Sequence, residues 1–301
     1  MAKHVLEMSL LRAYVAAVEE KTLSRAALRE DLVISAVSKR ITELERQVGV
    51  SLLLRHGRGV APTAAGATFY QRAKAILRSL SLAQDELCSY SADGTPKVRL
   101  AANPSTTVQF FPRDISQFLR ANAGFRLNLV EASSVDVPRM IVDGEADIGI
   151  YHAAAPTPGL HSRPYRKDKV CLVVPAGHPL AGRKAIRMED ALDYEFLGYF
   201  PRHSLEGFLE LAGPSISRPP LVRSEVSNYE ARCRMVAEGL GIAIIPAIIA
   251  RNYLAMMQFS IVDLLDDWAL RQMHICVRDR HSLPAMVEQL FSHLLACATD
   301  A

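Results

Sequence analysis

AALREDLVISAVSKRITELE, residues 26–45, predicts two short helices that cross at a tight turn. Ala26 and Ala27 are small enough for the first helix to lie close against the second. Apolar residues then recur at helical spacing and form one stripe: Val37, Ile41, Leu44 and Val48. The opposite face is short, polar and basic: Ser35, Lys39, Thr42 and Arg46. Such a face suits insertion into a DNA major groove, and the alternative is an ordinary amphipathic helix whose polar face is solvated.

The flanking residues favour the DNA-binding interpretation. Upstream, a further helical stripe could cover the helix pair, and it comprises Leu11, Tyr14, Val15 and Val18. Downstream, residues 51–62 (SLLLRHGRGVAP) contain an apolar run, a glycine-punctuated basic turn and a second short apolar run. This is the composition of a small β-wing, whose tip can place arginine against phosphates or in the minor groove. Three helices and a basic wing predict a winged helix-turn-helix.

These residues also carry a family resemblance. The N-terminal signature consists of AA at 26–27, SAVS at 35–38, Ile41, LE at 44–45, GV at 49–50, LL at 52–53, Arg55, RG at 58–59 and TAAG at 63–66. Later segments agree: VVPAGHPL at 173–180, VAEGLGI at 236–242 and Pro246. Together they resemble the LysR-type transcriptional regulators over essentially the whole chain. The resemblance implies a regulator that binds promoter DNA and responds to a small effector, as a homotetramer built from two dimers.

The recognition helix departs from the family pattern at its start. Members usually carry Leu, and then Ser-Gln-Pro, where this chain has Glu30 and then Val33, Ile34 and Ser35. Glutamine can make a bidentate contact to adenine, whereas Ile34 offers only apolar contact, for instance to a thymine methyl. The alternative is that Ile34 packs in the core of the helix-turn-helix. The family's base-reading pattern therefore cannot be transferred to this chain.

We expect a DNA-binding surface made of the recognition helix, the wing and two flanking arginines. The expected residues are Arg25, Ile34, Ser35, Ser38, Lys39, Arg40, Thr42, Arg55 and Arg58. Arg55 and Arg58 would lie on the wing, and Arg25 and Arg40 would lie nearer the DNA backbone. Two such helices in a dimer require an interrupted inverted repeat, with half-sites about one helical turn or a multiple apart.

Composition and charge agree with a globular regulator. The 301 residues are 50% hydrophobic and 22% charged, which is not the composition of a disordered chain. The net charge of +3 arises in residues 1–62, which hold ten Lys/Arg and seven Asp/Glu. Without an apolar run of membrane length or a signal peptide, the sequence predicts a cytoplasmic protein that makes no membrane contact. The five scattered cysteines predict neither disulfides nor a zinc site.

Three parts are predicted along the chain: a DNA-binding domain (1–62), a linker and dimerisation helix with a hinge (63–96), and an effector-binding domain (97–301). Residues 63–90 read as one long helix, with Thr63 as its N-cap. Its apolar stripe comprises Phe69, Ala73, Ile76, Leu77, Leu80, Ala83 and Leu87. A stripe of this length favours dimerisation over packing within its own domain. Residues 92–96 (ADGTP) break the helix.

After Pro96, short apolar runs alternate with helical patterns, which predicts an α/β domain with mostly parallel sheets. Strands are expected at 98–100, 126–130, 146–151, 170–174, 242–245 and 273–277. Helices are expected at 110–121, 135–143, 204–211, 229–238 and 283–298. The resemblance implies two Rossmann-like lobes with a ligand cleft between them, as in type 2 periplasmic-binding proteins. Lobe I would span about 97–169 and 268–301, and lobe II about 170–267.

Ligands of open α/β sheets bind at the carboxyl ends of strands, beside helix N-termini that attract anions. The strand ends give these candidate effector residues: Asn103, Ser105, Thr106, Ser134, Tyr151, His152, Tyr199, Arg202, His203, Ser204, Ser227 and Asn228. Asn103, Ser105, Ser134, Ser227 and Asn228 match the family's usual effector-contacting positions. For each Ser or Asn the alternative is a simple helix cap. Arg202 and His203 could supply charge to an anionic effector or be a solvated pair.

The sequence contains none of the common catalytic or phosphate-binding signatures, including GxSxG, HExxH and GxxxxGK[ST]. We therefore expect a regulator that is not an enzyme and needs no cofactor or metal. The rival interpretations are a two-lobed α/β metabolic enzyme and a DNA-binding protein that senses nothing. The expected partners are promoter DNA, a small effector, further copies of the chain and, for an activator, RNA polymerase.

Overall fold

The computed structural model of the protein describes residues 6–57, 59–89, 97–153, 156–198 and 215–299. The chain divides into two units, residues 1–94 and 95–301, and each is described by itself. Several predicted features lie outside the described residues: Arg58, Tyr199, Arg202, His203, Ser204, the break at 92–96 and the helix at 204–211. In the described part of the chain, no helix has the length and hydrophobicity needed to cross a membrane.

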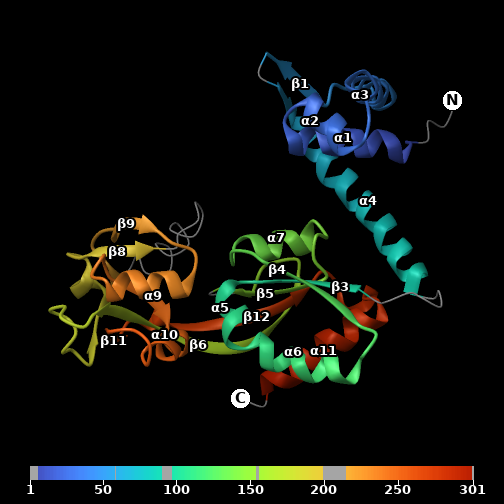
Figure 1. Ribbon diagram of the computed structural model, residues 1–301. Helices are drawn as coiled ribbons and strands as arrows, with labels where there is room; N and C mark the ends of the chain where they lie inside the picture. Colours follow the sequence, from blue (N-terminus) through green and yellow to red (C-terminus); the bar gives the residue numbers. More distant parts are fainter. Residues whose placement is uncertain (1–5, 58, 90–96, 154–155, 199–214, 300–301) are drawn as a thin grey trace. The chain divides into compact units, whose positions relative to one another are not determined.

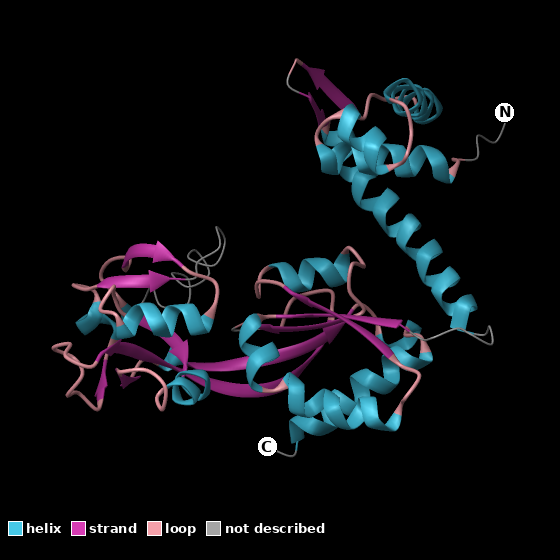
Figure 2. Ribbon diagram, in the orientation of Figure 1, coloured by secondary structure: helices cyan, strands magenta, loops and turns pink. Residues whose placement is uncertain are grey.

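The N-terminal unit is a winged helix-turn-helix, as predicted (Figures 1 and 2). Its elements are α1 (Met8–Glu20), α2 (Leu23–Arg29), α3 (Ile34–Val48), the antiparallel hairpin of β1 (Leu53–His56) and β2 (Gly59–Pro62), and α4 (Ala64–Ser89). The predicted stripe of α3 faces the core, where Val37, Ile41 and Leu44 are completely buried. Ala26 and Ala27 are buried in the same cluster and permit the close approach of α2 and α3.

Local hydrogen bonds define the boundaries of these elements. Gly49 ends α3 in the left-handed conformation, at a φ of 75°, which glycine adopts without steric cost. A carboxylate oxygen of Glu45 then accepts the backbone N–H groups of Leu52 and Leu53, at 2.8 and 3.0 Å, and fixes the entry into β1. The hydroxyl of Thr63 accepts the Gly66 N–H at 2.9 Å, so that Thr63 caps α4 as predicted.

The apolar stripe of helix α4 is partly packed against α1 and partly exposed. Phe69, Ala73 and Leu77 pack against α1 within the same unit. Ile76, beside Leu77, is 46% exposed, and Leu87, farther along the helix, is 71% exposed. The first part of the stripe therefore belongs to its own domain, which was the alternative interpretation, and Leu87 is not covered within that unit.

The second unit contains an eight-stranded sheet that both lobes share. Lobe I is built on β3 (Lys97–Ala102), β4 (Arg126–Glu131), β5 (Ile148–His152), β12 (Leu270–Val277) and the first part of β6 (His161–Pro175). Helices α6 (Phe111–Ala121) and α11 (Ala285–Thr299) contribute to the larger core cluster of this lobe, and α7 (Asp136–Val142) packs on the other face (Figure 1). Its remaining short elements are α5 (Pro104–Gln109) and the 3-10 turn η4 (Arg280–Ser282).

Lobe II surrounds the second part of β6. This part pairs with β10 (Ala243–Pro246) and β11 (Phe259–Leu264), and β7 (Ala185–Ile186) extends the sheet beyond β11. Two further strands, β8 (Glu195–Gly198) and β9 (Leu221–Glu225), form a small parallel sheet. The helical elements among the described residues of this lobe are α9 (Tyr229–Ala237), α10 (Ala247–Tyr253), η1 (Met188–Ala191) and η3 (Asp267–Ala269). The predicted two-lobed α/β architecture is confirmed.

The expectation of mostly parallel sheets is wrong. Strand β6 enters lobe II and β12 returns from it, so the two strands run in opposite directions and pair antiparallel. Antiparallel pairing also joins β12 to β5, and β6 to both β10 and β11. Among the described strands, parallel pairing joins β3 to its two neighbours, β8 to β9 and β7 to β11, and an isolated parallel bridge joins Phe196 to Ile242. The predicted strand at 170–174 is the distal third of the 15-residue strand β6.

Candidate DNA-binding surface and effector site

The outward face of α3 carries the predicted polar side chains. Ser35, Lys39 and Thr42 are exposed, and Ser38 and Arg40 are partly buried. Because Val37, Ile41 and Leu44 hold the opposite face in the core, these side chains are presented by a helix that is fixed from behind. The arrangement suits a recognition helix, whose side chains must reach base edges without moving the backbone.

Arg55 of the wing connects β1 to this face. Its Nη1 donates to the Ser38 hydroxyl at 3.1 Å, and its Nη2 donates to the Thr42 hydroxyl at 3.5 Å. Three of the predicted DNA-binding residues thus lie together in one polar group. The guanidinium is exposed and has five N–H donors, so donors remain for a phosphate or a base.

The wing is anchored to the turn between α1 and α2. The Val60 N–H donates to the Lys21 carbonyl oxygen at 2.9 Å. Gly59 has a φ of 139°, and a Cβ added to it would lie 2.3 Å from the same carbonyl oxygen. Only glycine permits this approach of the two backbones. Arg25 lies just beyond this turn, is exposed, and pairs with Glu20 at 2.9 Å.

Glu19 connects three helices, a feature that was absent from the predicted sites. Its carboxylate accepts from Arg29 of α2 at 2.6 Å and from the Tyr70 hydroxyl of α4 at 2.6 Å, and it pairs with Lys74 at 3.4 Å. Burial opposes ionisation of Glu19, but the hydrogen bonds and cations outweigh burial and lower its pKa. The carboxylate thereby ties α1 to both α2 and α4.

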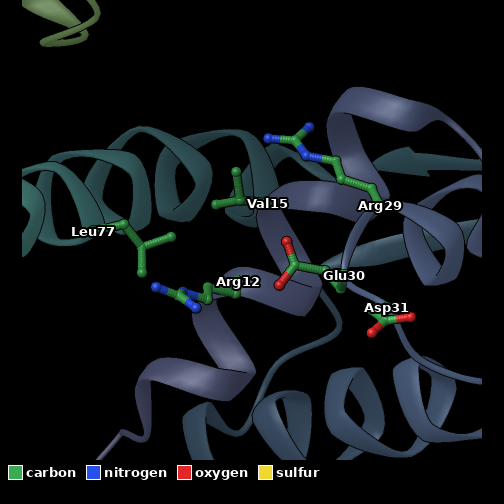
Figure 3. A pocket seen from close by; sticks show the side chains of 6 residues that line it. All are labelled: Arg12, Val15, Arg29, Glu30, Asp31 and Leu77. Atoms are coloured by element: carbon green, nitrogen blue, oxygen red, sulfur yellow. The ribbon is translucent and has the colours of Figure 1, made fainter.

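A cavity of about 420 Å³ lies beside these helices. It is lined by Arg12, Val15, Arg29, Glu30, Asp31 and Leu77. In Figure 3 the side chains of Arg12, Val15, Glu30 and Leu77 surround a common space. Glu30, which stands where the family usually has leucine, therefore lies on the wall of this cavity. None of the predicted DNA-binding or effector residues lines it.

Five of the predicted effector residues form one hydrogen-bonded group in lobe I. Asn103 accepts the Thr106 N–H at 2.9 Å and the Ser105 hydroxyl at 3.2 Å, and donates to the Ser134 hydroxyl at 2.9 Å. The Ser134 hydroxyl also accepts the His152 N–H at 3.1 Å. These residues lie at the carboxyl ends of β3, β4 and β5 because those strands run parallel. Asn103 caps α5, so the capping role and membership of this group coexist.

The His152 imidazole does not bring positive charge to this group at neutral pH. Burial, reinforced by nearby Arg271, lowers its pKa to about 4. The ring is therefore neutral, and it can donate or accept a hydrogen bond without attracting an anion by charge.

Tyr151 lies on the other face of the sheet. Its side chain is buried in the cluster that includes Val137 and Ile141 of α7. The hydroxyl accepts the Thr157 N–H at 2.9 Å and lies 3.4 Å from the Ser162 hydroxyl. A ligand contact would require Tyr151 to give up these bonds.

A buried ion pair lies where β6 passes from lobe I to lobe II, and it was not predicted. Asp168 and Arg271 are directly opposite in the β6–β12 ladder. The Asp168 carboxylate, 1% exposed, accepts Nε of Arg271 at 2.8 Å and also its Nη2. Gln109 of α5 donates to the same carboxylate at 2.8 Å and to the Ser105 carbonyl oxygen at 3.2 Å. The ion pair is thereby connected to the polar group of lobe I.

Lobe II contributes the start of α9. The Asn228 side chain accepts the Ala231 N–H at 3.0 Å and caps this helix, while Ser227 is exposed. Burial raises the pKa of the next residue, Tyr229, and this effect is partly offset by Arg271, Arg232 and Ser105. The guanidinium of Arg232 stacks 4.6 Å from the centre of the Tyr229 ring. Tyr229 therefore connects α9 to the polar residues of lobe I.

Comparison with known proteins gives matches over the whole chain. Residues 8–67 match the family of bacterial regulatory helix-turn-helix proteins of the lysR type, and residues 91–298 match the LysR substrate binding domain. The transcriptional regulator BenM of Acinetobacter baylyi is 26% identical, with 96% of this chain and 97% of BenM covered. The regulator CbbR of Sinorhizobium medicae is 30% identical, with 83% of this chain and 80% of CbbR covered.

Solved structures share the fold. A cysteine-to-aspartate variant of full-length OxyR from Pseudomonas aeruginosa is 21% identical with a TM-score of 0.67, and 98% of this chain and 97% of that chain are covered. CbnR, described as a LysR family transcriptional regulator, is 17% identical with a TM-score of 0.68, over 97% of this chain and 99% of CbnR.

Proposed function

Because the chain belongs to the LysR family of helix-turn-helix transcriptional regulators, we propose which of its surfaces reads DNA and which group of residues senses the effector. The DNA-binding surface consists of the outward face of α3, Arg55 of the wing and, near the DNA backbone, Arg25 and Arg40. One observation carries this proposal: Arg55 joins the wing to Ser38 and Thr42, next to the exposed Lys39. A dimer would place two such surfaces on an inverted repeat.

Lys39→Ala in the full-length protein tests the DNA-binding surface. If Lys39 holds a phosphate, we expect weaker binding to every sequence and a salt slope reduced by about one. If it reads guanine, base preference should change at one position of the site. Arg234→Ala is the matched control, because Arg234 is an exposed arginine of α9 in the other unit, paired to Glu230 at 2.8 Å. An unchanged affinity, salt slope and preference would remove Lys39 from the interface.

The effector site consists of the polar group of lobe I together with Arg271 and Tyr229. Asp168 occupies one edge of the Arg271 guanidinium, formed by Nε and Nη2. Nη1 makes no hydrogen bond to a described residue, and the side chain is 18% exposed. The second edge, formed by Nη1 and Nη2, can therefore donate two hydrogen bonds to a carboxylate in the bidentate geometry that arginine favours. This geometry supports an effector with an anionic group. It also means that Asp168 already neutralises the cation that the effector meets.

Melting temperatures of the full-length protein with acetate, succinate and benzoate, each compared with its neutral amide, test this assignment. We expect at least one acid, and not its amide, to stabilise the wild type. Arg271→Gln should abolish the difference. Asp168→Asn should enlarge it, after an initial destabilisation of about 3–5 kcal/mol from the uncompensated buried arginine. Equal stabilisation by acid and amide, or a response that survives Arg271→Gln, would refute the role of Arg271.

Ser134→Phe separates sensing from DNA binding. The bulky ring would enter the hydrogen-bonded group of Asn103, Ser134 and His152, all of which belong to the second unit. We expect loss of the carboxylate-dependent stabilisation with operator affinity retained. Loss of operator binding would show that Ser134 is structural, and an unchanged response would place the effector elsewhere.

The remaining assignments follow from membership of the family. We propose that the protein acts in the cytoplasm as a homo-oligomer, dimeric through α4 and tetrameric in its complete form. An activator would also contact RNA polymerase. Closure of the two lobes on the effector would change the geometry of the DNA-binding units. The effector can shift that equilibrium only through its different affinity for the two states.

A further inference from the structure

The first turn of the recognition helix carries two adjacent apolar side chains in an exposed position. Val33 stands at the N-cap of α3 and is 68% exposed, and Ile34 begins the helix and is 53% exposed. Residues that cap helices are usually Ser, Thr, Asp or Asn, because their side chains accept a free N–H of the first turn. Val33 makes no such bond. The chain has thus replaced a cap with apolar surface.

These side chains are not part of the hydrophobic core. The core of the N-terminal unit contains Val37, Ile41 and Leu44 of α3, with Leu32 packed against it, and includes neither Val33 nor Ile34. Packing of the helix-turn-helix, the alternative role for Ile34, therefore does not account for it. Exposed β-branched side chains at this point gain favourable burial only when another molecule covers them.

Charge identifies the kind of molecule. Residues 1–62 carry the whole net charge of +3. Ser35, Lys39 and Arg55 share the exposed surface of α3 and the wing. A basic surface with a small apolar patch at the start of a recognition helix complements the major groove, where phosphates flank the base edges. The one apolar group displayed there by the four bases is the C5-methyl of thymine.

We propose that Val33 and Ile34 read thymine methyl groups in each half-site of the operator. The proposal rests on DNA binding through α3 and adds the base that the first turn selects. The N-terminal residues of a recognition helix contact base edges, and in this chain the first two of them, Val33 and Ile34, can offer only apolar contact. The glutamine usual at position 34 in the family would instead select adenine.

Replacing thymine by uracil tests the proposal, because this change deletes the methyl group and leaves base pairing intact. The probe is a duplex selected from a random-sequence library by the full-length protein. Each thymine of the duplex is then replaced by deoxyuridine, one at a time. At one or two positions per half-site we expect about fourfold weaker binding, since burial of a methylene-sized group is worth roughly 0.8 kcal/mol. Equal binding of thymine and uracil duplexes at every position would overturn the proposal.

Protein variants connect the methyl group to the side chains. In Ile34→Ala or Val33→Ala, the thymine and uracil duplexes should bind alike at one of the sensitive positions, whereas Ile34→Gln should shift preference there toward adenine. The matched control is Ile248→Ala, which removes an isoleucine of α10 that is 45% exposed in the other unit. Circular dichroism melting should be unchanged for Ile34→Ala, because the side chain is outside the core.

The failures are distinguishable. If Ile34→Ala and Val33→Ala both keep full discrimination against uracil, other residues read the methyl groups. If they weaken binding equally to selected and unselected duplexes, the two side chains have no part in base selection. If the wild type selects no duplex at all, the assignment of α3 as the DNA-binding surface fails together with this inference.

Discussion

The Glu19 side chain of α1 contacts both of the helices α2 and α4 in the N-terminal unit. Its carboxylate receives hydrogen bonds from Arg29 of α2 and Tyr70 of α4, and Lys74 lies 3.4 Å away. Its pKa is lowered in the folded protein, because these donors outweigh the effect of burial. A group with a depressed folded pKa stabilises the protein above its unfolded pKa and loses that contribution as the pH falls through its folded pKa.

The ionised Glu19 carboxylate therefore contributes to the free energy of unfolding, and the Glu19→Gln variant lacks this contribution. We expect acid to remove it from the wild type. Above about pH 5 the wild type should be the more stable of the two, by on the order of 1 kcal/mol. The difference should begin to shrink as the pH falls below about 4.5, where a glutamate of the unfolded chain takes up a proton, and it should vanish below the lowered pKa of folded Glu19. Urea unfolding between pH 3 and pH 7 measures this. The matched control is Glu43→Gln, which removes a more exposed carboxylate paired to Arg46 at 2.6 Å. A Glu19→Gln difference that is independent of pH would contradict the role given to the charge.

At the residue scale, the sequence predicts polar side chains that gather at the ends of neighbouring strands. It does not predict side chains that meet only because two distant segments pair. Asn103, Ser134 and His152 could be predicted because each follows a strand, and parallel strands end at one edge. Asp168 and Arg271 could not, because they are 103 residues apart and meet only through the β6–β12 register. The charges that stand out within those two strands were the available signal.

At the scale of elements, the wing depends on one close backbone approach. Gly59 of β2 lies against the Lys21 carbonyl at the turn between α1 and α2. We expect Gly59→Ala to displace the hairpin and to cost about 1–3 kcal/mol, because both the backbone conformation and the space exclude a Cβ. Operator affinity should fall as Arg55 loses its position beside Ser38 and Thr42.

Gly57→Ala is the control for this variant. Gly57 lies on the same wing, and a Cβ added there meets nothing within 4 Å. Chemical denaturation and gel-shift titration should therefore show a loss of stability and of operator affinity for Gly59→Ala and little change for Gly57→Ala. Similar effects of both substitutions would show that the wing responds to loss of flexibility and not to the contact with Lys21.

Helices and strands could be predicted where a single sequence pattern, such as an apolar stripe or a capping residue, was sufficient to identify them. The stripe of α3 and the Thr63 cap of α4 both follow from side-chain spacing and capping chemistry. Helix α5 was missed because it has only six residues and Phe110 separates it from α6. Strand β6 was recognised only in its apolar distal third. Its first part is rich in charged residues and lacks the regular alternation of apolar and polar residues by which a strand is predicted from sequence.

At the scale of the whole molecule, the distal part of α4 is the surface expected to join two copies. Leu87 is 71% exposed, although the first part of the same stripe packs on α1. We expect Leu87→Glu to shift the protein toward monomers and to weaken operator binding by about 10²-fold or more, because the two half-sites lose their linkage. Sedimentation equilibrium and gel-shift titration measure the two effects.

Leu254→Glu provides the comparison for Leu87→Glu. Leu254 is 42% exposed at the end of α10, in the other unit. This variant should keep both the assembly state and the operator affinity of the wild type. An unchanged mass for Leu87→Glu would assign dimerisation to another surface.

The shared strand β6 has a consequence for the order in which the chain can fold during its synthesis. Lobe I needs β12 and α11 to complete its sheet and core, whereas the strands of lobe II lie in one continuous stretch of sequence, from the second part of β6 to β11, which precedes β12. At roughly 5–20 residues per second, a ribosome needs about 5–20 s to proceed from the middle of β6 to the end of β12. During this interval β3, β4 and β5 have emerged without their last neighbour, and β5 presents an unpaired edge. Lobe II is complete first, so lobe I is the part of the nascent chain that keeps an unpaired strand edge until β12 emerges.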